Sequence, residues 1–200
     1  MQNVAVLISG GGTNLQALID AQGRGEIADG RLRLVVSSDP KASALKRAED
    51  AGIAAAAEDR SRHSAGSFDK ALLEILQSHK IDVVVLAGFM CILGHEFLSH
   101  YPNRVINVHP SLIPSFCGRG FYGLKVHKAA LDYGVKVTGA TVHFVNEIPD
   151  GGRIILQKAV DVLNGDTPET LQRRVMEQAE WVILPKALAM LCRELESGRT

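Results

Sequence analysis

The sequence predicts an α/β fold with a doubly wound, mostly parallel sheet. Short apolar runs alternate with segments of helical spacing, which is the pattern of repeated βαβ units. The early runs are continuously apolar, as in strands buried on both faces. The last two runs are joined too closely for a parallel crossover. We therefore expect a Rossmann-like N-terminal half, then an antiparallel strand pair and a long C-terminal helix.

The first half alternates strands and helices along the chain. Residues 4–8 form an apolar run, SGGGTN follows at residues 9–14, and LQALID then has helical spacing. The run IDVVVLAGF contains the central strand, at residues 81–87. Further strands are expected at 32–36 and 104–108. Helices are expected at 42–51 and 68–78, and a third, short helix is expected to end at residue 100.

The pattern changes after Pro114. The stretch SFCGRGFYGLKVH, residues 115–127, is glycine-rich and aromatic and predicts a loop, with a short helix at 127–133. Strands are expected at 138–145 and 154–162. The sequence DTPE at 166–169 is a strong helix start, and Pro185 should break or kink the last helix. Without repeats or linkers, residues 1–200 form one predicted domain.

Composition and charge exclude several classes of protein. Lys and Arg number 22, as do Asp and Glu, and this balance argues against binding nucleic acid. No apolar run is long enough for a membrane span, and the N-terminus lacks the features of a signal peptide. The three cysteines, odd in number and far apart, predict a reducing, cytoplasmic location and neither a disulfide framework nor a CxxC metal site.

The glycine turn between the first strand and helix predicts an anion site. Glycines there let backbone N–H groups face a phosphate at a helix N-terminus. Gly10 and Gly12 fit a dinucleotide motif, but Leu15 stands at its third glycine, so a mononucleotide is favoured over NAD. A tight turn without a ligand is the alternative.

A second candidate site lies where the fourth predicted strand ends, in VINVHPSLIPS. Asn107 and His109 are two residues apart and point to the same side of an extended chain. An amide donor beside an imidazole suits oxyanion stabilisation and proton transfer. Asp150, on the turn before the last strand, could pair with the imidazole and raise its pKa. The alternatives are a strand-end cap for the pair and plain turn chemistry for Asp150.

Other polar residues carry weaker signals. His95 and His100 resemble a zinc motif, but at this spacing the two rings point about 140° apart on a helix, so we expect no metal site. His143 lies within TVHFV and is more typical of a satisfied core histidine than of a ligand. Glu180 and Trp181 occupy helical positions that face either the core or a cleft.

Taken together, these segments resemble the glycinamide ribonucleotide formyltransferases, folate-dependent enzymes of purine synthesis. The matching stretches are VLISGGGTNLQALID, DVVVLAGFMCIL, VINVHPSLIPSF, TGATVHFV and DGGRIILQKAV, which span almost the whole chain in order. The run NVHPSLIP with Asp150 downstream is the most specific match. Asn, His and Asp are shared by other formyl-tetrahydrofolate enzymes, so the acceptor assignment rests on the SGGGTN turn and on length.

The resemblance implies a formyltransferase fold, small-molecule substrates and no metal. Residues 1–108 would bind the nucleotide phosphate, and residues 109–200 would carry folate binding and catalysis. Formyl transfer from 10-formyltetrahydrofolate to glycinamide ribonucleotide would pass through a tetrahedral intermediate, with a protonated His109 held cationic by Asp150. The residues implied are Asn107, His109 and Asp150 for catalysis; Gly12, Thr13, Asn14 and Glu180 for the ribonucleotide; and Met90, Cys91, Ile92, Leu93, Asn107, Asn146, Glu147, Ile148 and Pro149 for the folate.

The sequence departs from the family at three places. Many members have Arg where Cys91 stands, the usual Glu-His pair is Glu180-Trp181, and the loop at 115–127 is longer than in some members. Transfer to another amine such as methionyl-tRNA, hydrolysis of formyl-tetrahydrofolate, and a nucleotide- or NAD-binding module without transfer chemistry are the alternatives. Monomer and homodimer both remain open.

Overall fold

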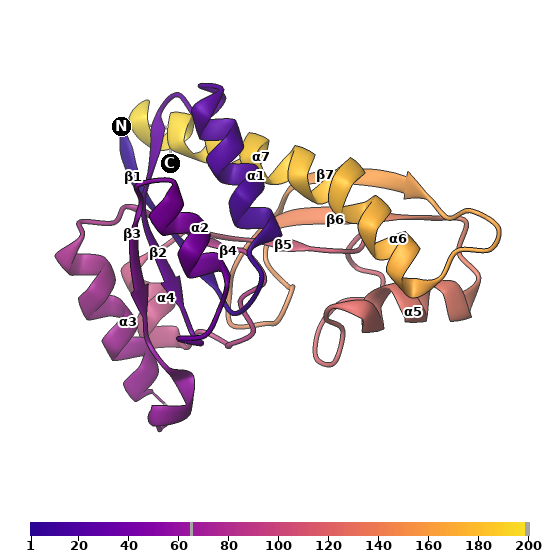
Figure 1. Cartoon of the computed structure of the whole chain (residues 1–200), viewed down its shortest axis with the longest axis horizontal. Coiled ribbons are helices and arrows are strands. Elements are labelled where there is room, and N and C mark those ends of the chain that lie inside the picture. The colour runs from indigo at the N-terminus through magenta and orange to yellow at the C-terminus, as the bar shows by residue number, and fades with distance from the viewer. Residues whose placement is uncertain (65, 199–200) are drawn as a thin grey trace.

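One seven-stranded sheet organises the part of the chain that the structure, a computed structural model, describes: residues 1–64 and 66–198 (Figure 1). The strand order is β3-β2-β1-β4-β5-β6-β7. The strands are β1 (Gln2–Ile8), β2 (Gly30–Ser37), β3 (Ala54–Ala57), β4 (Val83–Leu86), β5 (Val105–His109), β6 (Val137–Phe144) and β7 (Ile154–Asp161). The helices are α1 (Thr13–Gly23), α2 (Ala44–Asp50), α3 (Ser67–Ser78), α4 (His95–His100), α5 (Leu124–Tyr133), α6 (Pro168–Val175) and α7 (Trp181–Glu196), with a 3₁₀ turn at Arg60–Arg62 and a π-helical turn at Met176–Glu180.

The direction of the strands changes at β6. Strands β1 to β5 pair in parallel, whereas β6 runs antiparallel to both β5 and β7. The predicted fold class is therefore confirmed. Because β6 lies antiparallel beside β5, Asn107 is paired directly with His143 across the two strands. The reversal thus brings the start of the candidate site together with a residue 36 positions later in the chain.

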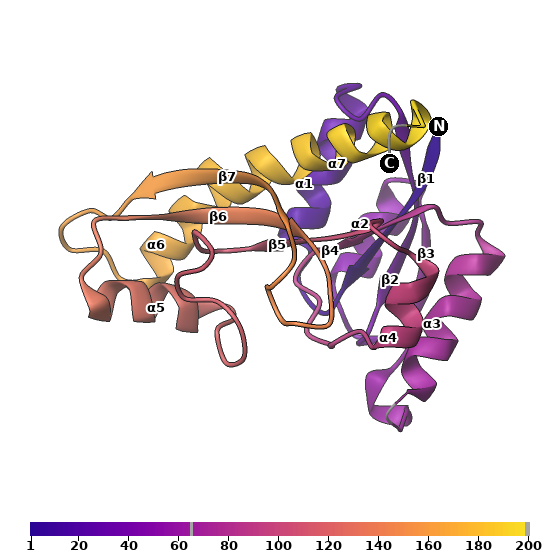
Figure 2. The ribbon, with the colours of Figure 1, turned by 180° about the vertical axis from the view of Figure 1, so that it is seen from behind.

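Helices cover both faces of the parallel part (Figures 1 and 2). Alternate side chains of a strand point to opposite faces, and Val6 packs in a core with α1, α2 and α7, while Leu7 packs in a second core with α3 and α4. Strands β6 and β7 extend beyond this parallel part, and α5 and α6 lie beside them (Figure 2). The sheet is therefore doubly wound, with a narrower C-terminal extension.

Three local expectations differ from the structure. Strand β3, an alanine run at the sheet edge, was not expected because alanine has little preference for strands. Helix α5 begins at Leu124, before the expected start at residue 127. Of the break or kink predicted at Pro185, the break is wrong, because α7 continues past it to Glu196. The departure from α-helical geometry occurs one turn earlier, in the π-helical turn.

No helix among the described residues has the length and apolar character needed to cross a membrane.

We expect Leu184→Ala to lower the free energy of unfolding by about 2–5 kcal/mol, the usual range for emptying a packed core position. Leu184 lies on α7 and is 0% exposed against the first core. Met190→Ala is the matched control, because Met190 is on the same helix but 43% exposed; it should cost less than about 1 kcal/mol. Urea unfolding of both variants makes the measurement. Equal losses would contradict the assigned packing of α7.

Candidate active site

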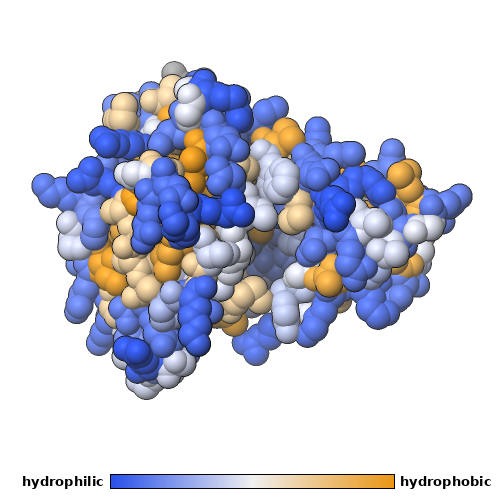
Figure 3. All heavy atoms as spheres, viewed as in Figure 1, coloured by the Kyte–Doolittle hydropathy of each residue, from blue (hydrophilic) through white to orange (hydrophobic). Residues whose placement is uncertain are grey.

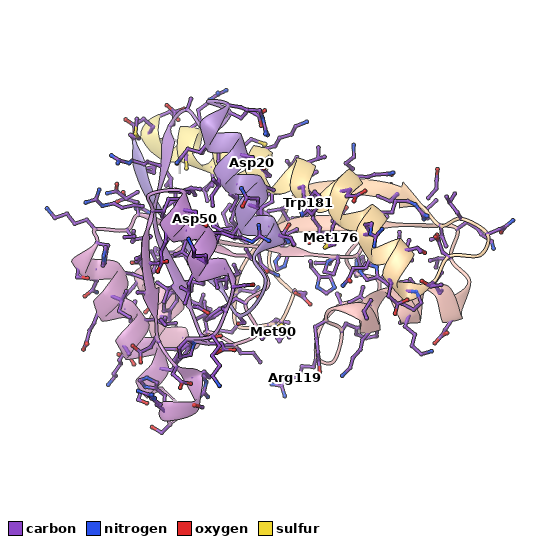
Figure 4. All side chains as sticks on the ribbon, in the orientation of Figure 1. Asp20, Asp50, Met90, Arg119, Met176 and Trp181 are labelled. Atoms are coloured by element: carbon purple, nitrogen blue, oxygen red, sulfur yellow. The ribbon has the colours of Figure 1, made fainter. Side chains whose placement is uncertain are left out.

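A cavity of about 470 Å³ lies between the parallel part of the sheet and its C-terminal extension. Figure 3 shows the hollow between the two parts. Its walls come from the carboxyl ends of β4 and β5, the loop before α5, the loop before β7 and the π-helical turn. Met90, Arg119 and Met176 surround the opening on three different segments (Figure 4). Open α/β sheets place ligands at this edge, beyond the strand ends.

The glycine turn reaches this cavity through one of its three predicted residues. Asn14 lines the cavity, whereas Thr13 lines a neighbouring hollow beside Trp181, and Gly12 lines neither. Gly12 has a φ of 72°, and a Cβ there would lie 2.5 Å from the Cβ of Ala44. Tight packing against α2 therefore requires this glycine whether or not a ligand binds. Leu15, at the third position of the dinucleotide motif, is a core residue.

The backbone carbonyl groups and the backbone N–H groups of the glycine turn differ in their hydrogen bonds. The carbonyl of Gly10 accepts from the N–H of Ala44, and that of Gly11 accepts from the Arg47 guanidinium. Within the described part of the chain, the N–H groups of Gly10, Gly11 and Gly12 donate to no protein atom. Free N–H groups before a helix N-terminus can bind an anion. The geometry is therefore compatible with a phosphate site and also with a tight turn that binds no ligand.

Glu180 is buried beside the glycine turn. Its Oε2 accepts from Asn14 Nδ2 at 2.7 Å, and its side chain lines the cavity with only 6% exposure. Burial raises the pKa of Glu180 to about 7, although the Asn14 hydrogen bond opposes the rise. The π-helical turn ends at this residue, and such turns are frequent at functional sites. Two residues predicted for the ribonucleotide therefore contact each other here.

The three predicted catalytic residues converge at the end of β5. His109 Nδ1 lies 3.5 Å from Asp150 Oδ2, and His109 and Asp150 are both largely buried. Asn107 lies two residues earlier on β5 and lines the same cavity. The chain brings Asp150 over from the loop between β6 and β7. A strand-end cap does not account for this grouping, since the carboxylate comes from a distant segment.

The backbone of the loop fixes the position of Asp150. Asp150 itself has a φ of 56°, a conformation that Asp tolerates better than most residues. A Cβ at Gly152 would lie 1.7 Å from the carbonyl oxygen of Phe144, so only glycine lets the loop approach β6 this closely. The tight turn expected around Asp150 is therefore present, and it holds the Asp150 carboxylate in its place in the site.

Two histidines and a backbone amide surround the Asp150 carboxylate. Oδ2 accepts from the Gly118 N–H at 2.8 Å, and Oδ1 lies 3.6 Å from His143 Nε2. Burial alone would raise the pKa of Asp150. The contacts with His143, His109 and the Gly118 N–H outweigh burial and lower the pKa below its ordinary value. The carboxyl group is therefore ionised at neutral pH and is available to accept a proton.

Asp150 raises the pKa of His109, as expected, but the expectation that it holds the ring cationic is wrong. Burial lowers this pKa, and it outweighs the opposing effects of the Phe116 carbonyl and Asp150. His109 Nε2 donates to the Phe116 carbonyl oxygen at 2.9 Å. The ring is therefore neutral at neutral pH, with its Nε2–H already engaged by the loop before α5. Donation from this nitrogen to a ligand requires that carbonyl to move.

Two further histidines line the cavity, and sequence reasoning did not place them there. His143 is 1% exposed and contacts both Asn107 and Asp150. His127, in the first turns of α5, is fully buried, and neither ring nitrogen has a partner in the described part of the chain. Burial, with a smaller effect of His109, lowers its pKa to about 4. Only the antiparallel pairing of TVHFV with VINVH could have indicated the role of His143.

Apart from Asn107 at the end of β5, the residues predicted for the folate line the cavity from two other segments. One of these segments follows β4, and the other lies between β6 and β7. Met90 and Ile92 are exposed at the opening, Cys91 is half-buried, and Leu93 is buried. The lining residues from these segments are Met90, Cys91, Ile92, Leu93, Asn146, Glu147, Ile148 and Pro149. A largely apolar wall of this kind suits a flat aromatic ligand.

The assembled groups suit transfer of an acyl group between two bound molecules. Asn107 supplies an amide N–H, and Asp150 supplies an ionised carboxylate next to a neutral imidazole. His95 and His100, rejected above as a zinc pair, are both exposed outside this site, and His95 contacts Glu147. Among the described residues, no group of three or more His, Cys, Asp or Glu side chains is arranged to hold a metal ion.

Known proteins share both the sequence and the fold. The family model described as formyl transferase matches residues 2–188. Phosphoribosylglycinamide formyltransferase of Escherichia coli (strain K12) is 43% identical over 192 residues, which cover 94% of this chain and 85% of that protein. The trifunctional purine biosynthetic protein adenosine-3 of Bos taurus is 45% identical over 201 residues, but this chain spans only 19% of its length.

A solved structure agrees with these relatives. The glycinamide ribonucleotide transformylase 1 from Symbiobacterium toebii superimposes with a TM-score of 0.90 at 45% identity, and the match covers 96% of this chain and 88% of that one. The match of the family model includes every residue that lines the cavity and all of the strands. On this ground, the chain belongs to the formyl transferase family.

Proposed function

We propose that this protein is a phosphoribosylglycinamide formyltransferase, which transfers the formyl group of 10-formyltetrahydrofolate to the amine of glycinamide ribonucleotide. One observation carries the proposal: Asn107, His109 and Asp150 meet at one end of a cavity that also extends to the glycine turn. The E. coli relative is a phosphoribosylglycinamide formyltransferase and the Symbiobacterium structure is that of a glycinamide ribonucleotide transformylase, which supports this choice of acceptor. The free cysteines Cys91, Cys117 and Cys192 fit a reducing, cytoplasmic location.

The two substrates would enter from opposite ends of the cavity. The ribonucleotide phosphate would bind the free N–H groups of the glycine turn, and Glu180 with Asn14 would contact the rest of the ribonucleotide. The pterin would lie against the apolar wall around Leu93 and Ile148. This placement leaves the amine and the formyl group to meet near Asn107. Holding two reactants in line accounts for much of the rate enhancement that a site of this kind can provide.

The transfer would proceed by direct attack. The amine nitrogen forms a bond to the formyl carbon, and the carbonyl electron pair moves onto oxygen. The Asn107 amide N–H donates to that oxyanion. As the intermediate collapses, the bond from the formyl carbon to the folate nitrogen breaks, and this nitrogen takes up a proton that the attacking amine has lost. The ionised Asp150 is the group that accepts and returns this proton.

His109 would support this proton transfer from beside the carboxylate. Its ring is neutral in the free protein because of burial. A negative charge that develops next to the ring favours its protonated form. The proton that the amine loses can be shared between Asp150 and the unprotonated Nδ1 of His109, 3.5 Å away, so His109 gains positive charge as the oxyanion forms. The charge would then appear only in the transition state, where it lowers the barrier.

The function is tested by incubating the purified protein with glycinamide ribonucleotide and 10-formyltetrahydrofolate. Both the consumption of the formyl-folate and the formation of the formylated product are measured. We expect one product molecule for each folate consumed. Glycine amide and methionyl-tRNA serve as competing acceptors and should give no detectable product. Folate loss without a formylated acceptor would indicate hydrolysis, and transfer to methionyl-tRNA would overturn the proposed acceptor.

Removing the oxyanion donor should slow the reaction strongly. We expect Asn107→Ala to lower kcat by roughly 10²–10³-fold. Asp150→Asn should lower kcat by at least about 10²-fold through loss of the proton acceptor. Asparagine is used because it tolerates the positive φ of 56° at this position. The control Asn164→Ala changes an exposed turn residue outside the cavity. A variant of Asn107 or Asp150 that matches this control would remove that residue from the mechanism.

Ionisation of Glu180 should destabilise the fold as pH rises. Its pKa is raised from 4.5 to about 7 on folding, so between these values the folded state holds a proton that the unfolded state has lost. Relative to Glu180→Gln, wild type should therefore lose roughly 3 kcal/mol of unfolding free energy through this window, most of it before pH 8. Urea unfolding of both proteins at pH 5 and pH 8 measures the difference. If the difference in unfolding free energy between the two proteins is the same at pH 5 and pH 8, Glu180 has an ordinary pKa.

A further inference from the structure

His143 is the residue that faces the proposed oxyanion donor most directly. It lies opposite Asn107 in the antiparallel pairing of β5 with β6. Its Nε2 lies 3.2 Å from Asn107 Nδ2. At 1% exposure, the ring has almost no access to solvent, so its hydrogen bonds are made to protein atoms. The contact has no role in the transfer steps derived above.

The backbone determines which nitrogen of His143 carries the proton. Nδ1 lies 2.8 Å from the carbonyl oxygen of Phe144, and a carbonyl oxygen only accepts hydrogen bonds. Nδ1 must therefore be protonated. In the neutral ring, Nε2 is then a bare acceptor. This tautomer matches the side chain that faces it, because Asn107 presents its amide nitrogen.

The tautomer in turn fixes the orientation of the Asn107 amide. If the amide turned over, its oxygen would face the lone pair of Nε2, and two acceptors would be in contact. In the observed orientation, one N–H of Nδ2 binds Nε2, and the other has no protein partner among the described residues. Asn107 lines the cavity, so this second N–H remains for a ligand.

We propose that His143, as the tautomer protonated on Nδ1, is a positioning residue that holds the Asn107 amide with one N–H directed at the formyl oxygen. The proposal rests on the formyltransferase function stated above. A hydrogen-bond donor that is already oriented stabilises the transition state more than one that must first reorient, because nothing has to rearrange as the charge forms. The side chain of His143 need not touch either substrate to have this effect.

The charged groups around His143 define the competing arrangement. Asp150 Oδ1 lies 3.6 Å from Nε2, farther than the Asn107 amide at 3.2 Å, and His109 contacts the same carboxylate. A second proton on the ring would make Nε2 a donor to Asp150. The Asn107 amide would then have to turn its oxygen toward the ring. Protonated His143 and neutral His143 therefore specify opposite orientations of the amide.

A double-mutant cycle between these two residues tests the proposal. We expect His143→Leu to lower kcat by about tenfold, with little change in KM for either substrate. In an Asn107→Ala background, the same substitution should have no further effect, because the amide that it positions is gone. His143→Gln should restore most of the rate, since its side-chain oxygen can accept where Nε2 does. Equal losses of kcat in both backgrounds, or no rescue by glutamine, would overturn the proposal.

Nitrogen-15 NMR of the His143 ring tests the tautomer without any turnover. The expected result at neutral pH is a protonated Nδ1 and an unprotonated Nε2. The opposite tautomer, or protons on both nitrogens, would contradict the assigned orientation of the amide. This readout also separates the two proposals. A wild-type protein that transfers no formyl group but shows the expected tautomer would overturn the function and keep the contact between His143 and Asn107.

Discussion

The placement of the Asp150 carboxylate between two buried imidazoles is the interaction on which the site depends. His109 and His143 each approach one of its oxygens, and the Gly118 N–H donates to the same group. The Gly118 N–H donates to the carboxylate in every protonation state of the two rings, and a proton on either ring stabilises the ionised carboxylate further. These contacts also tie together β5, β6, the loop before α5 and the loop before β7. Without the carboxylate, two buried histidines and a loop would lack a common partner.

The reversal of strand direction at β6 makes this arrangement possible. A parallel neighbour of β5 would need a long crossover connection, usually a helix. The antiparallel pairing instead sets Asn107 opposite His143. It also returns the β6–β7 loop, with Asp150, to the end of β5. The parallel part offers the glycine turn at the same edge, so one cavity spans both halves.

The sequence predicted the sheet and the three catalytic residues more fully than it predicted the protonation states of the histidines in the site. Buried strands are continuous apolar runs, and the antiparallel pair followed from a short connection, whereas the alanine strand β3 has no such signal. Asn107, His109 and Asp150 were found from spacing and family resemblance. The pKa of His109 was predicted in the wrong direction because burial depends on packing from distant segments. For the same reason, His143 could not be distinguished from a core histidine before the register of β5 and β6 was known.

A crystal structure with glycinamide ribonucleotide and an unreactive formyl-folate analogue would test the central claim most directly. We expect the formyl oxygen within about 3.2 Å of Asn107 Nδ2, and the attacking amine within hydrogen-bonding reach of Asp150. The phosphate should lie on the N–H groups of the glycine turn. A formyl oxygen bound away from Asn107, with Asp150 facing neither the amine nor the folate nitrogen, would contradict the proposed site.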